Sequence, residues 1–176
     1  MTLAGVALTT LASVLVISEP TDLSTQDRSN NAAAALDGYH ENPSISTTGS
    51  GTLDLTLDDK NEVIAFLLSY DQLEGIDPTV PGGVVVAAHI HLGALGVNGG
   101  VVAHLCGGGG KPACPTSGSV SGTIVPGDIS GPAAQGLGPG GATTFAEFVQ
   151  AIRAGYTYVN VHTTRWPGGE IRGQIK

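Results

Sequence analysis

Four of the five histidines of this chain lie in segments that resemble β-strands. His89 and His91 are two positions apart in one apolar run, and His104 and His162 follow in later runs that contain valine. Because side chains alternate across a strand, His89 and His91 project from one face, roughly 6.5 Å apart along the strand. Imidazoles at that spacing can bind one metal ion. Histidines from neighbouring strands would complete an all-nitrogen site that suits copper or zinc.

Alternating patterns predict the strands that carry these histidines. Leu53, Leu55 and Leu57 alternate with polar residues, and residues 58–61 have the composition of a hairpin turn. The same patterns predict strands over residues 51–58, 62–70, 82–92, 100–106, 117–125, 156–163 and 169–175.

A single helix is predicted over residues 144–154. Thr144 and Glu147 have the spacing of a capping box, and Gly155 is a helix-ending residue. The apolar stripe consists of Phe145, Phe148, Val149 and Ile152. One helix among many strands predicts an all-β fold, a Greek-key β-sandwich or barrel of about 7–8 strands with one short crossover helix.

The composition agrees with an all-β domain, and the net charge excludes some classes of partner. The chain has 27 glycines, and only 12% of its residues are charged, whereas 41% are hydrophobic, which is enough for one domain with a core. The net charge of −8 argues against nucleic acid and anionic lipid as partners. It also disfavours anionic substrates unless a local basic group attracts them.

The alternation of the strands predicts which face carries the site. The valines and isoleucines of the last two strands belong in the core, so His162 and Arg172 lie on the outer face of neighbouring strands. By the same rule His89 and His91 point outward, whereas the inward residues are Val86, Ala88 and Ile90. The candidate site therefore lies on the outside of the β wall, under glycine-rich loops, where Asn160 is placed to orient a metal ligand.

The N-terminal segment is typical of an exported protein. Residues 3–17 form an apolar run that is short for a membrane span and fits a secretory signal. We interpret residues 1–18 as a signal peptide or membrane anchor and 19–33 as a linker, with the domain over 34–176. A buried N-terminal strand or helix is the alternative. The first interpretation predicts an extracellular, periplasmic or cell-surface protein, with membrane anchoring through residues 3–17 as an option.

The two cysteines, Cys106 and Cys114, enclose a glycine-rich loop. An isolated pair of this kind in an exported β domain predicts a disulfide, which would contribute about 2–3 kcal/mol of stability. The alternative is that the Cys106 thiolate helps His104 to bind metal, because regular alternation places these two residues on one strand face.

Several motifs resemble one known family when they are taken together. They are Ala88-His-Ile-His-Leu-Gly93, Tyr158-Val-Asn-Val-His-Thr163 and Pro167-Gly-Gly-Glu-Ile-Arg-Gly-Gln174, with Gly38–Pro43, Thr47–Gly51, Gly96–Gly100 and Phe145–Gly155. In this order they resemble the CHRD domain, named after chordin, over residues 34–176. The resemblance implies an extracellular β-barrel domain of secreted proteins, a family without one common function.

A second, weaker resemblance concerns the arrangement of the site. A His-x-His strand, a later histidine, an arginine on the last strand and a loop disulfide look like the copper–zinc superoxide dismutases. The corresponding residues here are His89 and His91, His162, Arg172, and Cys106 with Cys114. Too few histidines remain for a separate zinc site, so the resemblance implies a copper-only enzyme. His104 would be the fourth copper ligand or the one released on reduction.

These observations lead to three alternative functions. The first is a secreted protein with one copper ion per chain and superoxide dismutase activity, in which Arg172 attracts superoxide as the substrate. The second is a non-catalytic module for the extracellular matrix, adhesion or copper holding. The third is a zinc site of three histidines and water that performs hydrolysis. His40, Arg165 and Trp166 are weaker site candidates, since loop or turn positions explain them equally well.

Overall fold

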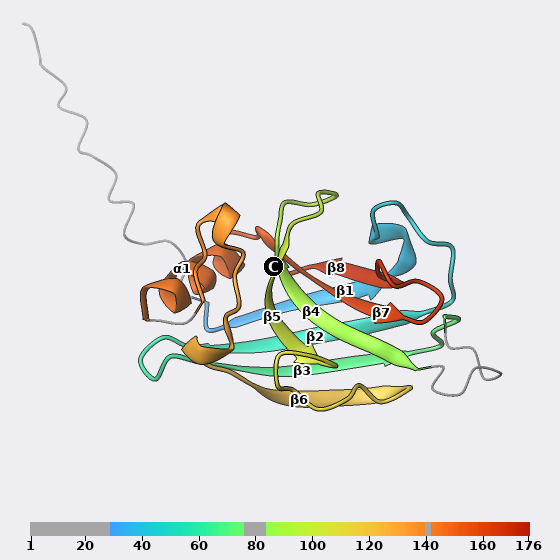
Figure 1. The fold of residues 1–176 in the computed structure, drawn as a ribbon, viewed down its shortest axis with the longest axis horizontal. Coiled ribbons are helices and arrows are strands. Elements are labelled where there is room, and N and C mark those ends of the chain that lie inside the picture. Colours follow the sequence, from blue (N-terminus) through green and yellow to red (C-terminus); the bar gives the residue numbers. More distant parts are fainter. Residues whose placement is uncertain (1–28, 76–83, 140–141) are drawn as a thin grey trace, which may run out of the picture.

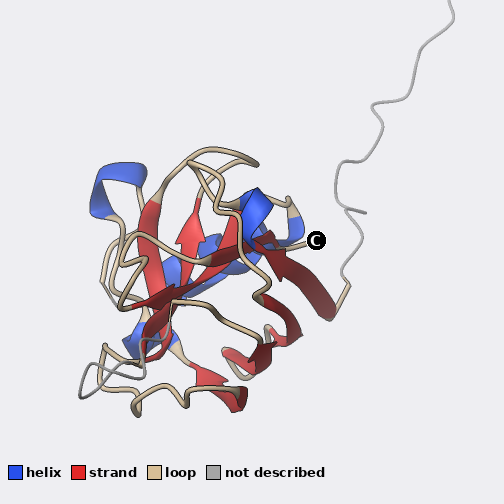
Figure 2. Ribbon diagram, turned by 90° about the vertical axis from the view of Figure 1, so that its right-hand side faces the viewer, coloured by secondary structure: helices blue, strands red, loops and turns tan. Residues whose placement is uncertain are grey.

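The computed structural model describes residues 29–75, 84–139 and 142–176, and eight antiparallel strands dominate them. The strands form one sheet in the order β5-β4-β7-β8-β1-β2-β3-β6, which curls into a nearly closed barrel (Figures 1 and 2). Their bounds are β1 Asn31–Asp37, β2 Ser50–Asp58, β3 Val63–Asp71, β4 Val85–Leu92, β5 Gly100–Cys106, β6 Gly118–Ile124, β7 Thr157–Thr163 and β8 Ile171–Gln174. The predicted all-β class is confirmed.

Strand β1 is the element that the sequence patterns missed. It begins at Asn31, inside the segment interpreted as a linker, and pairs with β2 along its whole length. Its inward residues Ala32, Ala34 and Leu36 are buried, but alanine has little preference for strands, so the alternation gave a weak signal. The predicted signal or anchor at 1–18, and residues 19–28 of the linker, lie outside the described residues.

Most core positions follow the predicted alternation, with one exception in β4. Leu53, Leu55 and Leu57 are buried in the barrel, as predicted. Val86 was expected in the core but is 44% exposed, because the pairing of β4 with β7 is irregular between Val85 and Ala87. The irregularity shifts the parity by one position before the histidines are reached.

A second irregularity separates His104 from Cys106. The partners along β4 and β5 are His89 with His104 but Ala88 with Cys106, so β5 has an extra residue at this point. Cys106 therefore faces the core, where it is fully buried, whereas His104 lies beside His89 on the outer face. The prediction that His104 and Cys106 share a strand face is wrong.

Helix α1 spans Ala142–Arg153 and lies across one end of the barrel (Figure 1). Its predicted apolar stripe is buried in the core. The helix begins before Thr144, so Thr144 lies inside its first turn and the predicted capping box is wrong. Alanine at the start is a strong helix former and extends the helix N-terminally. Within the described ranges, three short 3-10 turns are present as well, at Gly38–His40, Pro126–Asp128 and Ala133–Gln135.

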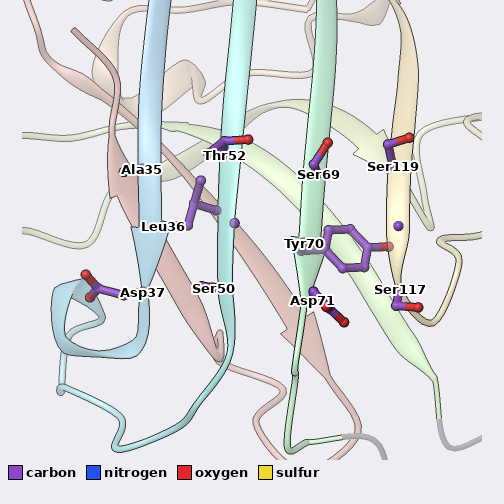
Figure 3. Close-up of a pocket in the computed structure, with 12 residues that line it drawn as sticks. Ala35, Leu36, Asp37, Ser50, Thr52, Ser69, Tyr70, Asp71, Ser117 and Ser119 are labelled. Atoms are coloured by element: carbon purple, nitrogen blue, oxygen red, sulfur yellow. The ribbon is translucent and has the colours of Figure 1, made fainter.

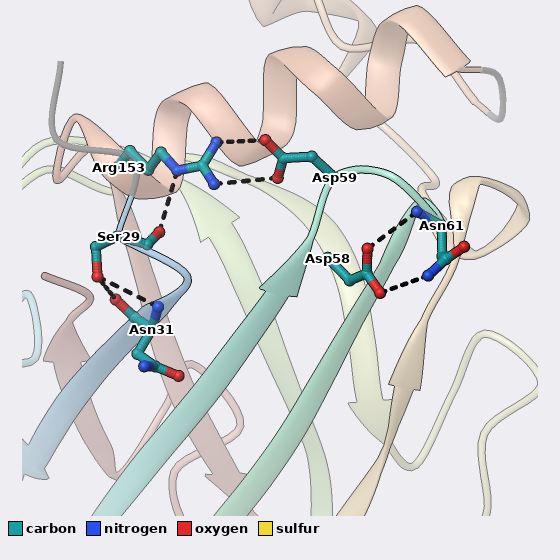
Figure 4. Close-up of polar contacts among 6 residues, drawn as sticks. All are labelled: Ser29, Asn31, Asp58, Asp59, Asn61 and Arg153. Atoms are coloured by element: carbon teal, nitrogen blue, oxygen red, sulfur yellow. Dashed lines mark hydrogen bonds and ion pairs between the residues drawn. The ribbon is translucent and has the colours of Figure 1, made fainter. Parts of the chain in front are cut away.

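Polar contacts fasten α1 to the turn between β2 and β3. Arg153 donates from Nη1 and Nη2 to the two carboxylate oxygens of Asp59, at 2.8 and 3.1 Å, and from Nε to the Ser29 carbonyl (Figure 4). Asp58 accepts hydrogen bonds from the backbone and side chain of Asn61, which closes the predicted hairpin turn. Among the helices of the described ranges, none has the length and apolar character needed to span a membrane.

Candidate metal centre

Three histidines converge on the outer face of two neighbouring strands. His89 and His91 come from β4 and His162 from β7, and one nitrogen of each lies within 4.8 Å of the others. The outward parity predicted for His89 and His91 is confirmed, because Ala88 and Ile90, which alternate with them along β4, are buried in the core. Two adjacent strands thus supply three imidazoles to one point, as the spacing of the motif predicts.

Backbone carbonyls fix the orientation of two of these rings. The Nδ1 atom of His91 lies 3.0 Å from the Gly99 oxygen, and Nδ1 of His162 lies 2.9 Å from the Pro167 oxygen. A carbonyl only accepts, so the proton of each neutral ring belongs on Nδ1 and the lone pair on Nε2. Metal-binding histidines are held in the same way by their second nitrogen.

The ring nitrogens that do not contact a backbone carbonyl lie close together, and few hydrogen-bond donors are near them. Nδ1 of His89 lies 3.1 Å from Nε2 of His162. In the part of the chain that the structure describes, the buried Nε2 atom of His91 has no hydrogen-bond partner. A buried polar atom without a partner is costly, and a cation is one means of satisfying it.

Burial and mutual repulsion keep the histidine cluster neutral. Burial, together with the charges of the neighbouring histidines, lowers the pKa of His89 to about 3. Burial also lowers the pKa of His91 to about 4. It lowers the pKa of His162 and of His104 as well. Neutral imidazoles at physiological pH have lone pairs to offer a metal ion.

His104 lies beside this cluster and is covered by the disulfide loop. Its ring is 4.4 Å from that of His89 and nearly perpendicular to it, and its Nδ1 atom is buried with no partner in the described ranges. Gly108 and Gly109 pack on the ring so closely that a Cβ atom on Gly108 would lie 2.6 Å from Nδ1 of His104. His104 is therefore a neighbour of the three-histidine group, and its predicted role as a fourth ligand stays a prediction.

The predicted disulfide between Cys106 and Cys114 is present and excludes a Cys106 thiolate as a metal ligand. It closes the loop that covers His104. A second attachment holds the same loop, because Lys111 pairs with Asp128 at 2.8 Å and donates to the Thr123 carbonyl.

Replacing both cysteines by serine is expected to lower the free energy of unfolding by about 2–3 kcal/mol, the value for a short loop. The loop should also release His104, so that diethyl pyrocarbonate modifies His104 faster than in the wild type. Chemical denaturation and peptide mass spectrometry measure the two effects. Wild-type protein with the disulfide intact is the control, and an unchanged modification rate at His104 would show that the loop does not shield it.

Arg172 is on the predicted outer face, but it is only 1% exposed. Its guanidinium stacks on Tyr158, 3.4 Å from the ring centre, and donates to Asn98 Oδ1 and the Val97 carbonyl at 2.9 and 2.8 Å. The His91 ring is parallel to Tyr158 at 4.7 Å, and both partners fit only on opposite faces of the phenol. Tyr158 thus separates Arg172 from the histidines.

An ion pair with Asp128 or Glu170 would be the ordinary alternative to an active-site role for Arg172, and neither ion pair forms among the described residues. Asp128 pairs with Lys111, and the Glu170 carboxyl accepts only from neutral donors among the described residues. The reason is the segment 93–99, which folds over Arg172 and offers its own carbonyls. The role of Arg172 as a catalytic residue stays a prediction, and its contacts are those of a residue that holds this segment.

Two buried residues behind the cluster were not among the predicted metal ligands. Asn160 Oδ1 lies 2.9 Å from Nε2 of His162. Burial raises the pKa of Glu41 to about 7, although Arg172 and the Asn160 side chain oppose this rise. Among the described residues, Oε1 of Glu41 is buried without a hydrogen-bond partner. Glu41 belongs to the motif Gly38–Pro43, which is the only sequence signal that points to it.

The weaker candidates lie outside the cluster. His40 is exposed and bonded to Asp37 at 2.7 Å, and Arg165 stacks on Trp166 in the turn after β7. A shallow hollow of about 850 Å³ lies on the other half of the sheet, across β1, β2, β3 and β6 (Figure 3). Small and hydroxyl side chains such as Ala35, Thr52 and Ser119 line it, and no histidine does.

Comparison with known proteins identifies one family. Residues 32–175 match the model of the CHRD domain, which covers most of the chain. Searches of curated proteins and of solved structures give no match. The likeness to the copper–zinc superoxide dismutases therefore stays a prediction from the arrangement of the site.

Proposed function

Since the chain belongs to the CHRD domain family, we propose that it is an extracellular β-barrel module that binds one copper ion through His89, His91 and His162. The observation that carries this proposal is the convergence of three imidazole nitrogens within 4.8 Å, where the buried Nε2 atom of His91 has no partner in residues 29–75, 84–139 and 142–176. The Cys106–Cys114 disulfide is compatible with an oxidising, extracellular location.

The donor set supports copper as the metal. Imidazole nitrogen suits both copper and zinc, but copper(II) binds a given nitrogen site more tightly than zinc does. A structural zinc site is closed by four protein ligands. Here three nitrogens form the compact group and His104 stands beside it.

Dismutase activity is the finer form of this proposal. Copper held by imidazoles would supply one-electron redox chemistry to superoxide. His89 and His104 are partly exposed and leave the site accessible to a small anion on that side. The protein gives such an anion little attraction, because the net charge is −8 and Arg172 lies behind Tyr158. These contacts support metal binding more strongly than catalysis.

The test is metal analysis of protein purified without added metal and then loaded with copper or zinc. We expect one copper ion per chain by elemental analysis and a copper(II) spin-resonance signal with nitrogen hyperfine splitting. A superoxide dismutase assay on the loaded protein, with an equal concentration of free copper as the reference, then separates enzyme from module. Protein that retains neither copper nor zinc after desalting would refute metal binding altogether.

The shifted pKa values predict how the stability of the metal-free protein depends on pH. In the folded state the pKa values of His89 and His91 are about 3 and about 4, below the ordinary value of 6.5. Between these values the unfolded chain binds more protons, so the free energy of unfolding falls as the pH falls. Glu41, with its pKa raised from 4.5 to about 7, acts in the opposite direction over that range.

Because the histidines outnumber Glu41, we expect the melting temperature to fall between about pH 7 and about pH 5. Glu41→Gln removes the opposing contribution and should make this fall steeper. Differential scanning calorimetry at constant ionic strength measures it. A melting temperature that rises towards pH 5 would contradict the assigned directions.

A further inference from the structure

The side chain of Asn160 is buried at the point where the histidines meet. Asn160 is 3% exposed in the middle of β7, opposite His89 of β4 on one side and Arg172 of β8 on the other. Its Oδ1 atom lies 2.9 Å from the same Nε2 atom of His162 that lies 3.1 Å from Nδ1 of His89. The amide oxygen of Asn160 therefore lies at the place where the ring nitrogens of His89 and His162 meet.

The neutral ring of His162 cannot donate a hydrogen bond to both of its oxygen neighbours. Nδ1 of His162 lies 2.9 Å from the Pro167 oxygen, and Nε2 lies 2.9 Å from Asn160 Oδ1. Both oxygens are acceptors, but a neutral imidazole carries a single N–H. With the proton on Nδ1, the lone pair of Nε2 faces the lone pairs of Oδ1, and a cation between them turns this repulsion into attraction.

The Asn160 amide is oriented with Nδ2 on the side of Glu41 and Oδ1 on the side of His162. Asn160 opposes the rise that burial causes in the pKa of Glu41, and the NH₂ group is the part of an amide that can donate to a carboxylate. Gly169 leaves the space for this contact: it has a φ of +126°, and a Cβ atom there would lie 2.1 Å from Glu41 Oε1 and 2.8 Å from Asn160 Nδ2. With NH₂ on Glu41, Oδ1 faces His162.

We propose that Asn160 Oδ1 is a further ligand of the metal ion, which makes a site of three nitrogens and one oxygen, and that Glu41 is its positioning residue. The proposal rests on the metal-binding function proposed above. The separations of 2.9 and 3.1 Å agree with donors about 2.0–2.2 Å from a shared ion, which stand about 2.9 Å apart at right angles and about 3.3 Å apart in a tetrahedron.

An oxygen donor changes the metal preference of the site. Copper(I) favours soft sulfur and nitrogen donors, whereas divalent ions accept an amide oxygen. Asn160 therefore selects copper(II) and zinc(II) over copper(I). Glu41 adds a carboxyl group behind the amide, and this outer contact holds the oxygen towards the metal in the way that second-layer contacts hold metal-binding histidines.

The test compares variants of the full chain in competition with chelators for Zn²⁺, Cu²⁺ and Cu⁺. Asn160→Leu keeps the size of the side chain but has no donor, and it should weaken Zn²⁺ binding by at least about tenfold while Cu⁺ binding changes little. Asn160→Asp keeps an oxygen and should bind Zn²⁺ at least as tightly as the wild type. Glu41→Gln should weaken Zn²⁺ binding by about 10-fold, the lower end for an outer contact. Asn61→Leu, in the distant β2–β3 turn, is the matched control.

The outcomes separate this proposal from the function on which it rests. Wild-type protein that binds neither Zn²⁺ nor Cu²⁺ refutes metal binding itself. Wild-type binding with Asn160→Leu equally tight for Zn²⁺ overturns the oxygen ligand alone and assigns Asn160 an ordinary hydrogen bond to His162. If Asn160→Leu does not fold, Asn160→Ala is measured in its place. The copper(II) spin-resonance spectrum gives an independent readout, because loss of an oxygen donor shifts its parameters and loss of a distant contact does not.

Discussion

His91→Ala is expected to weaken copper(II) and zinc(II) binding by more than about 100-fold, beyond the roughly 10–100-fold that loss of an outer contact costs. The reason is that Nε2 of His91 is buried and has no hydrogen-bond partner among the described residues, while Nδ1 is fixed by the Gly99 carbonyl. The free nitrogen therefore has no competing bond. Titration against a chelator of known affinity measures the change.

The matched control for this variant is His40→Ala. His40 is exposed, bonded to Asp37 and outside the cluster, so its loss should leave metal affinity unchanged. Because His91 also stacks on Tyr158, folding of the variant has to be verified by its circular dichroism spectrum. A folded His91→Ala protein with wild-type affinity for both metals would show that His91 is not a ligand.

The second large effect is expected for Glu170→Ala, which should lower the free energy of unfolding by about 3–5 kcal/mol. The Glu170 carboxyl is fully buried and accepts four hydrogen bonds, and alanine would leave all four donors without a partner. These donors are the side-chain hydroxyls of Thr47 and Thr163 and the backbone N–H groups of Glu74 and Gly75. These donors belong to three separate segments of the chain, and the Glu170 carboxyl holds the three segments together.

A loss of that size corresponds to a fall in melting temperature of about 10 °C in a domain of this length. Thermal and urea denaturation of the metal-free protein measure it. Glu147→Ala is the control, since Glu147 lies on the exposed face of α1 and should change stability by less than about 0.5 kcal/mol. A Glu170→Ala protein within about 1 kcal/mol of the wild type would contradict the assigned role.

The strands with strong side-chain alternation could be predicted from the sequence, and those with weak alternation could not. The leucines of β2 and the apolar stripe of α1 predict their own elements. Large side chains that must all be buried on one face fit the period of a strand or that of a helix, but not both. Strand β1 repeats alanine on both faces, so the pattern does not distinguish inside from outside. Its position in the sheet depends on pairing with β2, which is a tertiary effect.

The three-histidine group could also be predicted, because the parity rule holds where pairing is regular. It fails at the irregularities beside Val86 and Cys106, since one extra residue reverses every later side chain. No strand pattern predicts the positions of the loops that cover the site, which are the segment 93–99 and the disulfide loop. For that reason the burial of Arg172 and the contact of Glu41 with Asn160 became visible only in three dimensions.

The place of the β7–β8 hairpin in the sheet has a consequence for biogenesis. β7 pairs with β4, and β8 lies beside β1, yet this hairpin follows all the other strands in the chain. A growing polypeptide therefore has two separate half-sheets, β4–β5 and β1–β2–β3–β6, until β7 and β8 have been synthesised. Non-local pairing of this kind is slow. His162 arrives with β7, so the three-histidine group is incomplete while only β1 to β6 have been made, and a metal ion held by all three histidines cannot template the early fold.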